Sequence, residues 1–292
     1  MELIKKYHLR SPAKINLYLR VIKKLSNNYH EIDSLISHVG VFDEITVLEN
    51  KNKQTSVKFF GEFSKSISNK NNSIISVISL LKKLNKKIKE KNFTIKVKKN
   101  IPVGSGLGGG TSNAVTILKF LQKRFNLKIK KNNLKQIYSS IGADSKVFAD
   151  SYLKFISGYG DKVYSYKAKI KLNILLIFPN KPNFTKTIYQ NNKIFSKKLK
   201  IDVAKKMIRK NIFNFLNIAG NDLLLSAKKL NLPMSNLLAF LERQNICDFI
   251  QMSGSGSCCY AVFKSKKSLL KCQKLVKIKY RSYWTAVTKT IT

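Results

Sequence analysis

The segment from Ile101 to Ala114 contains the residue types of a loop that binds phosphate. It reads Ile-Pro-Val-Gly-Ser-Gly-Leu-Gly-Gly-Gly-Thr-Ser-Asn-Ala, with five glycines in seven positions. Glycines have no side chain, so the backbone N–H groups of such a loop can close around a ligand. The unpaired N–H groups and the positive dipole end of a following helix favour an anion, and Ser105, Thr111 and Ser112 add hydroxyl donors. The segment therefore predicts a phosphate cradle.

This cradle differs from two familiar phosphate loops. No Lys-Ser or Lys-Thr follows the glycines, so it is not a P-loop. No acidic residue ends a following strand at the distance that the dinucleotide fingerprint requires. A flexible linker would not be flanked by Ile-Pro-Val and an amphipathic helix.

A second glycine cluster, Met252 to Ser257, precedes the apolar run Cys258 to Phe263. By itself it is compatible with a simple tight turn. Two glycine-rich loops in one chain also suggest two backbones that converge on one ligand. Both interpretations remain open from the residues alone.

Two charged residues stand in apolar surroundings. Lys14 interrupts a strand-like run between Ala13 and Ile15, and Asp144 follows the apolar end of a predicted helix. Each has a simple structural explanation, because one lysine among many is usually solvated and an aspartate often caps the next segment. The pair Tyr29-His30 follows a polar stretch and could equally be surface.

The net charge of +41 comes from 56 basic and 15 acidic residues. Such a charge favours nucleic-acid binding or the steering of a phosphorylated substrate. However, only six of the basic residues are arginine, the type that recognises bases and phosphates best. The lysines are scattered through every segment and accompany abundant Asn and Ile, as A/T-rich codon usage would produce. A solvated surface is therefore the favoured interpretation.

Composition places the chain among globular proteins, with 43% hydrophobic and 24% charged residues in 292. No apolar run approaches the roughly 18 residues that a membrane helix needs, and no secretory signal follows Met1. The four cysteines form no C-x-x-C pair and only three histidines accompany them, which argues against a zinc site. We expect a soluble, cytoplasmic protein with reduced thiols.

Periodicity predicts an α+β protein without repeats, in two domains joined near residues 151–157. Strands are expected over 9–21, 39–48, 93–98, 172–178, 258–263 and 283–288, and helices over 111–125, 133–141, 203–210, 221–229, 234–243 and 267–276.

Five segments occur in the order seen in the kinase superfamily of galactokinase, homoserine kinase, mevalonate kinase and phosphomevalonate kinase (GHMP). They are Ser11–Leu17, Tyr29–Glu31, Pro102–Ala114, Gly142–Asp144 and Met252–Ser257. The triple glycine before Thr-Ser-Asn and the Tyr-His pair look most like the 4-diphosphocytidyl-2-C-methyl-D-erythritol kinases. This resemblance spans nearly the whole chain.

The resemblance implies a two-domain α+β small-molecule kinase fold with the active site in the cleft between domains. Residues 1–155 would form the ATP-binding and catalytic domain, and residues 156–292 would contribute to substrate binding. The implied reaction is ATP-dependent phosphorylation of the 2-hydroxyl of 4-diphosphocytidyl-2-C-methyl-D-erythritol, in non-mevalonate isoprenoid precursor biosynthesis. The implied cofactors are ATP and Mg²⁺, with no protein ligand assigned to the metal.

The resemblance also implies residue roles. Asp144 would be the general base, and Lys14 would keep it ionised and neutralise charge on the transferred group. ATP would bind to Lys99, Pro102, Val103, Gly104, Ser105, Gly106, Leu107, Gly108, Gly109, Gly110, Thr111 and Ser112. The substrate would bind to Asn16, Tyr29, His30, Thr185 and Tyr189, with histidine on the cytosine edge and aromatic rings on its faces.

The chain departs from the family pattern in two places. Asn27-Asn28 stands where the family usually has Asp-Gly, and Ser145-Lys146 stands where it usually has Val-Pro. Neither change removes a predicted catalytic group. Two alternatives remain: another kinase of the superfamily, whose substrate carries no base to stack on, and a basic nucleic-acid-binding protein.

Overall fold

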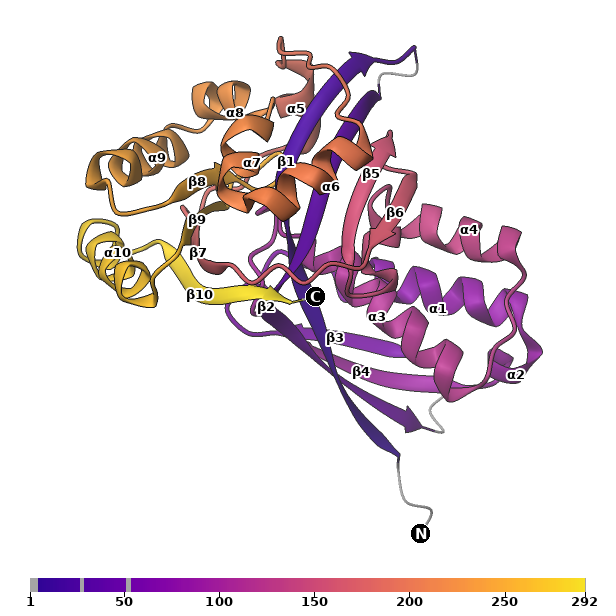
Figure 1. The fold of residues 1–292 in the computed structure, drawn as a ribbon. Coiled ribbons are helices and arrows are strands. Elements are labelled where there is room, and N and C mark those ends of the chain that lie inside the picture. Colours follow the sequence, from indigo (N-terminus) through magenta and orange to yellow (C-terminus); the bar gives the residue numbers. More distant parts are fainter. Residues whose placement is uncertain (1–4, 27–28, 51–53, 292) are drawn as a thin grey trace. The chain divides into compact units, whose positions relative to one another are not determined.

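A computed structural model describes residues 5–26, 29–50 and 54–291, which form two compact units (Figure 1). Unit 1 holds the described residues of Met1–Ala13, Val41–Val103 and Gly108–Asp150, and unit 2 those of Lys14–Gly40, Gly104–Leu107 and Ser151–Thr292. Two long strands, β1 (Lys6–Lys24) and β2 (His30–Asn50), contribute residues to both. The division into domains 1–155 and 156–292 stays a prediction.

Unit 1 contains a sheet that ends at the glycine loop. Strand β4 (Asn92–Lys98) pairs antiparallel with β2, from Lys98 opposite Glu44 to Asn92 opposite Asn50. On its other side β4 pairs in parallel with β3 (Ser56–Phe60). Alternate residues of β4 are buried, as the sequence alternation predicts. The end of β4 therefore fixes where the glycine loop begins.

Helices α1, α3 and α4 pack together over one face of this sheet (Figure 1). The helices of unit 1 are α1 (Ser73–Leu84), α2 (Lys86–Lys89), α3 (Gly109–Arg124), α4 (Lys131–Ile141) and the 3₁₀ helix η1 (Ser145–Ala149). The buried stripe of α3, including Ile117 and Leu121, belongs to one apolar core with Phe93 and Ile95 of β4. This packing anchors the first turn of α3 behind the glycine loop.

Unit 2 contains the strands β7 (Asn173–Phe178), β9 (Cys259–Phe263), β8 (Phe249–Met252) and β10 (Trp284–Ile291). Strand β7 pairs antiparallel with β10 and β9, and β9 pairs antiparallel with β8. The hairpin between β8 and β9 contains the second glycine cluster. In the same unit, β5 (Leu153–Gly158) pairs with the first part of β2 and with β6 (Lys162–Tyr166).

Helices α8, α9 and α10 contribute to one buried core with the strands of unit 2. The helices of this unit are α5 (Thr185–Gln190), α6 (Ile201–Lys210), α7 (Ile212–Ala219), α8 (Leu224–Leu230), α9 (Leu232–Gln244) and α10 (Lys266–Lys279). Asn231 caps α9 and Ser265 caps α10 by accepting from backbone N–H groups of the first turn.

The α+β class and the twelve predicted elements are confirmed. Most ends shift by three residues or fewer, but the strand predicted over 39–48 begins nine residues earlier, at His30 of β2. Most of residues 151–157, near which a junction of two domains is predicted, belong to the buried strand β5. Helix α8 starts at Leu224 instead of Asn221, because the backbone of Asn221 forms a parallel bridge with Leu19. Asn27-Asn28 lies outside the described residues.

Among the described residues, no helix is both long enough and apolar enough to cross a membrane.

Candidate active site

The second half of the glycine loop opens α3 in unit 1. Gly108 has φ of 72°, a left-handed conformation that suits glycine, and α3 begins at the next residue. The first turn has no side-chain cap. Gly110 in that turn is exposed, and a Cβ added to it would meet nothing within 4 Å. Open space therefore lies beside the helix N-terminus, where an anion is favoured.

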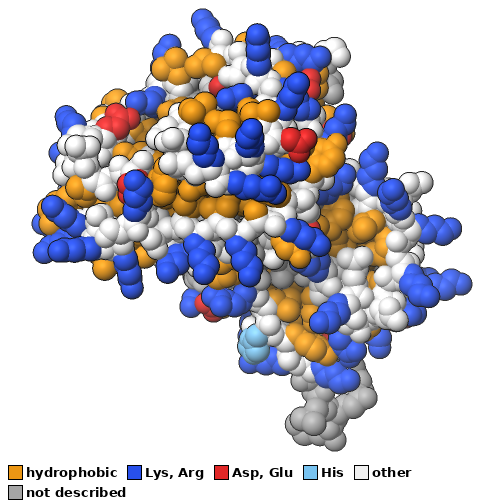
Figure 2. All heavy atoms as spheres, viewed as in Figure 1, with side chains coloured by type: hydrophobic (Ala, Val, Ile, Leu, Met, Phe, Trp, Pro, Cys, Tyr) orange, Lys and Arg blue, Asp and Glu red, His pale blue; other side chains and the backbone are white. Residues whose placement is uncertain are grey.

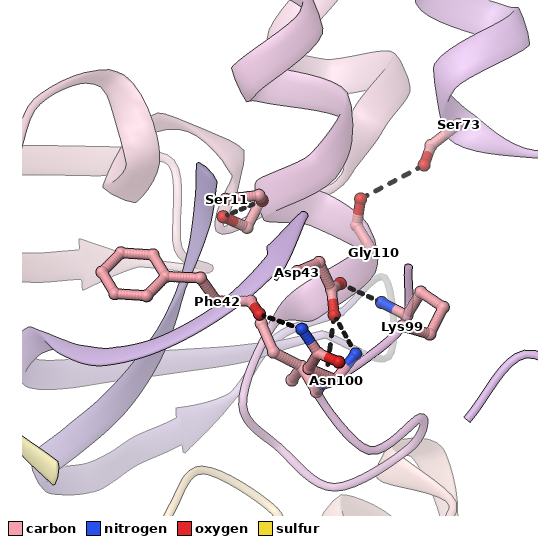
Figure 3. Close-up of polar contacts among 9 residues, drawn as sticks. Ser11, Phe42, Asp43, Ser73, Lys99, Asn100 and Gly110 are labelled. Atoms are coloured by element: carbon pink, nitrogen blue, oxygen red, sulfur yellow. Dashed lines mark hydrogen bonds and ion pairs between the residues drawn. The ribbon is translucent and has the colours of Figure 1, made fainter. Parts of the chain in front are cut away.

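Hydroxyl groups hold this first turn in place (Figure 3). Ser11 Oγ donates to Ser112 Oγ at 2.8 Å, and both residues are buried. Ser73 Oγ, at the start of α1, donates to the carbonyl of Gly110 at 3.4 Å. The Ser112 hydroxyl is thus part of the internal hydrogen bonding of unit 1.

A buried ion pair precedes the loop. Lys99 follows β4, is 2% exposed, and pairs through Nζ with Oδ2 of Asp43, which is fully buried on β2. The other carboxylate oxygen accepts the backbone N–H of Asn100 at 2.8 Å and that of Ile101 at 2.9 Å (Figure 3). The Lys99 ammonium, which the resemblance assigns to ATP, is therefore engaged with a carboxylate.

Asp144 lies next to the first turn of α3 within unit 1. Its carboxylate Oδ1 and the hydroxyl of Thr111 each lie 3.8 Å from the position that a Cβ would take on Gly142. Asp144 precedes η1 but makes no side-chain cap there, so the capping explanation does not account for it. The residue is half-buried. A potential base and a hydroxyl of the predicted phosphate loop thus lie around one point.

Lys14 belongs to β1 in unit 2 and is 6% exposed. Its Nζ donates to Oδ1 of Asn16 at 2.7 Å, and Nδ2 of Asn16 donates to Oγ of Ser34 at 2.9 Å. Residues 14 and 16 lie on the same face of the strand, as alternation requires. This chain of hydrogen bonds orients the Lys14 ammonium.

The two glycine-rich segments meet in unit 2. Ser253 Oγ donates to the carbonyl of Gly106 at 3.1 Å, and the N–H of Cys258 donates to the carbonyl of Ser105 at 3.0 Å. The N–H of Lys14 donates to the carbonyl of Leu107 at 2.9 Å. The second loop is therefore more than an isolated tight turn, because it binds the first loop directly.

Gly254 of the second loop approaches Lys14 closely. A Cβ on Gly254 would lie 3.3 Å from Nζ of Lys14 and 3.2 Å from Oδ1 of Asn16, and its φ is +59°. Only glycine satisfies both requirements without strain. The second loop therefore helps to shape the surroundings of the predicted catalytic lysine.

Two asparagines that the sequence analysis missed hold the second loop. Asn221 Nδ2 donates to the carbonyls of Met252 at 3.0 Å and Gly254 at 2.9 Å. Asn183 Nδ2 donates to the carbonyl of Ser255 at 2.8 Å. Their positions carried no signal, because asparagine is abundant throughout this chain.

The predicted cytosine-binding residues lie in unit 2. The rings of His30 and Tyr189 have centroids 5.1 Å apart at 38°, so the structure brings these two together. Tyr29 is 58% exposed, and its ring lies 5.9 Å from that of Tyr159. Thr185 is exposed, with Oγ1 2.9 Å from Oγ of Ser255. Burial, and to a smaller extent the positive charge of Lys24, lowers the pKa of His30 below its usual 6.5.

Comparisons with known proteins show the family to which the chain belongs. The GHMP kinases N terminal domain matches residues 72–153, and the GHMP kinases C terminal domain matches residues 203–281. A 4-diphosphocytidyl-2-C-methyl-D-erythritol kinase of Pelagibacter ubique is 37% identical over 98% of this chain and 99% of its own. A kinase of the same name from Buchnera aphidicola subsp. Acyrthosiphon pisum is 34% identical over 91% of this chain and 89% of its own.

Solved structures show the same fold. A crystal structure of 4-(cytidine 5'-diphospho)-2C-methyl-D-erythritol kinase matches with a TM-score of 0.77 at 20% identity, over 98% of this chain and 100% of that one. Homoserine kinase from Cytophaga hutchinsonii matches with a TM-score of 0.68 at 15% identity, over 100% of this chain and 96% of that one. The chain belongs to the GHMP kinases and, within them, to the family of the 4-diphosphocytidyl-2-C-methyl-D-erythritol kinases.

Proposed function

We propose that this protein transfers the γ-phosphate of ATP to the 2-hydroxyl of 4-diphosphocytidyl-2-C-methyl-D-erythritol. The reaction would belong to non-mevalonate isoprenoid precursor biosynthesis and take place in the cytoplasm. The observation that carries the proposal is that Oδ1 of Asp144 and the hydroxyl of Thr111, in the first turn of α3, each lie 3.8 Å from the Cβ position of Gly142. The relatives named for this reaction match along the whole chain.

Asp144 and Lys14 divide the chemistry between them. Asp144 takes the proton of the 2-hydroxyl as that oxygen bonds to the γ-phosphorus, while the bond to the β,γ-bridging oxygen breaks and ADP leaves. Lys14 neutralises charge on the transferred group. Its hydrogen bond to Asn16 fixes the ammonium before substrate arrives, and such preorganised charge is an effective form of catalysis.

The first turn of α3 supplies backbone N–H groups to the phosphates of ATP. Mg²⁺ would accompany the nucleotide, since this ion is commonly held by substrate phosphates together with one or two carboxylates. Among the described residues, no group of three or more His, Cys, Asp or Glu side chains could hold a metal. The phosphates of ATP would supply most of its ligands, and no carboxylate of this chain is assigned to it.

His30 and the nearby tyrosines would recognise the cytosine. The lowered pKa keeps His30 neutral near pH 7, so its ring offers one donor and one acceptor to the base edge. Stacked rings need centroids roughly 4.5–7 Å apart, so the 5.1 Å between His30 and Tyr189 leaves no space for a base between them. The base therefore stacks on an outer face or separates the two rings.

The charge distribution on the face that Figure 2 shows does not favour the nucleic-acid alternative. On the face in view, Lys and Arg side chains stand singly or in small groups between hydrophobic and other residues (Figure 2). A polyanion-binding surface would instead gather them into a stripe or patch.

Turnover with a panel of acceptors tests the proposal. The purified protein is given ATP and Mg²⁺ with 4-diphosphocytidyl-2-C-methyl-D-erythritol, homoserine or mevalonate, and ADP formation is followed. We expect ADP only with the cytidine compound. Turnover with homoserine or mevalonate would keep the phosphate loop but contradict the cytosine site, and no turnover with any acceptor would contradict the proposed reaction.

A further inference from the structure

Asp43 connects three consecutive positions at the entrance to the glycine loop (Figure 3). It is fully buried on β2. Its Oδ1 accepts the N–H groups of Asn100 and Ile101, and its Oδ2 pairs with the ammonium of Lys99. One carboxylate thus fixes the backbone direction at the point where β4 ends.

The same cluster reaches the start of α3. A Cβ on Gly109 would lie 3.2 Å from Nζ of Lys99 and 3.0 Å from Cγ2 of Ile101. The residues that Asp43 holds therefore pack directly against the first residue of that helix. A shift of Lys99 or Ile101 would move the loop that the proposed function assigns to ATP.

We propose that Asp43 is a positioning residue for nucleotide binding, acting through the backbone of Asn100 and Ile101. The inference rests on the proposed function, because it takes the glycine loop as the ATP site. Oδ1 tethers the entrance of the loop, and Oδ2 balances the buried charge of Lys99. The Lys99 side chain supports the loop from within the fold, and its ammonium does not bind the phosphates directly.

The tether can be separated from the charge with two double variants. Asp43→Asn with Lys99→Met removes both charges but leaves an oxygen that can accept the two N–H groups. Asp43→Leu with Lys99→Met removes the charges and that acceptor, while an apolar pair of similar volume fills the space. The two variants carry the same charge and differ in whether residue 43 can accept the two backbone N–H groups.

We expect the Leu/Met variant to have a KM for ATP about tenfold or more above that of the Asn/Met variant, because small displacements of a binding loop are costly. The kcat and the KM for the phosphate acceptor should stay within about threefold. A purely structural role would change thermal stability alone, so equal KM values for ATP in both variants would overturn the proposal.

A matched control removes another carboxylate of the same strand. Glu49 on β2 pairs with Arg124, with Oε1 and Nε 2.7 Å apart, and this pair lies in unit 1. Glu49→Gln should leave the KM for ATP within about twofold of wild type, because part-exposed ion pairs contribute little. An increase as large as that of the Leu/Met variant would show a general effect of charge loss and overturn the proposal.

Two further measurements test the inference without acceptor turnover and without a folded Leu/Met variant. The affinity of a non-hydrolysable ATP analogue, measured by calorimetry, should separate the two double variants even if no acceptor is turned over. If the Leu/Met variant does not fold, hydrogen exchange on the wild-type protein decides. Protected N–H groups at Asn100 and Ile101 without nucleotide support a preformed tether, and rapid exchange there contradicts it.

Discussion

The Nζ atom of Lys14 donates a 2.7 Å hydrogen bond to Oδ1 of Asn16, two residues further along β1. Asn16 is in turn held by Ser34 on β2. The lysine side chain is buried, so its charge is oriented by the strand instead of moving as a surface lysine would. This arrangement leads to a first prediction.

Lys14→Met should reduce kcat roughly 10²- to 10³-fold, because a preorganised charge on the transferred phosphoryl group is lost. Lys14→Arg should not restore the rate, since the guanidinium has a different shape and hydrogen-bonding geometry. Steady-state kinetics at saturating ATP check both variants. A near-native kcat in Lys14→Met would contradict the assigned role.

Asp144→Asn should reduce kcat by roughly 10²-fold or more, as loss of a general base does. Binding of an ATP analogue should change little, because the backbone N–H groups of α3 remain. The control is Asp202→Asn, which removes a carboxylate whose side chain is 95% exposed. If Asp144→Asn turns over like this control, Asp144 is not the base.

Two glycine variants test different features of the glycine loop: Gly110→Ala tests phosphate binding and Gly106→Ala tests the close approach of the two loops. A Cβ at Gly110 would meet nothing within 4 Å, so Gly110→Ala should fold normally yet weaken ATP binding by occupying the open space. A Cβ at Gly106 would clash with the carbonyl oxygen of Ser253, and its φ is +79°, so Gly106→Ala should lower thermal stability. Melting temperatures and ATP affinities check the pair. Unchanged ATP affinity in a folded Gly110→Ala would place the phosphates elsewhere.

Tyr189→Ala should raise the KM for the cytidine substrate by about 5- to 150-fold, equivalent to a stacking loss of roughly 1–3 kcal/mol. The KM for ATP should not change. Tyr164→Ala serves as a control, since this tyrosine is 53% exposed and has no assigned role. Equal KM values for the cytidine substrate in the two variants would show that Tyr189 does not stack on the base.

The lowered pKa of His30 predicts a pH dependence of stability. As pH falls through 6.5, the unfolded chain takes up a proton at His30 while the folded protein does not. The unfolded state then binds more protons, so the free energy of unfolding decreases below pH 6.5 and is unaffected by this group above it. Urea unfolding from about pH 5 to 8, the range in which histidine titrates, should show a smaller decrease in His30→Gln. Identical pH profiles would contradict the prediction.

Local patterns in the sequence were sufficient to predict the glycine loop, the alternating strand β4 and the helical stripe of α3. They did not reveal what Asp43 and Asn221 hold, because their partners Asn100 and Met252 lie 57 and 31 residues away along the chain. Such roles depend on which strands and loops meet, and no local periodicity encodes that. Strand β5 was missed because its residues are buried on both faces and do not alternate.

The central claim is tested most directly by following the γ-phosphate itself. The protein is incubated with Mg²⁺, 4-diphosphocytidyl-2-C-methyl-D-erythritol and ATP labelled in the γ-phosphate, and the product is analysed by phosphorus and carbon NMR. We predict a phosphomonoester on the 2-hydroxyl that carries the label, formed together with one ADP. Label found only in inorganic phosphate, or on another hydroxyl, would contradict the account.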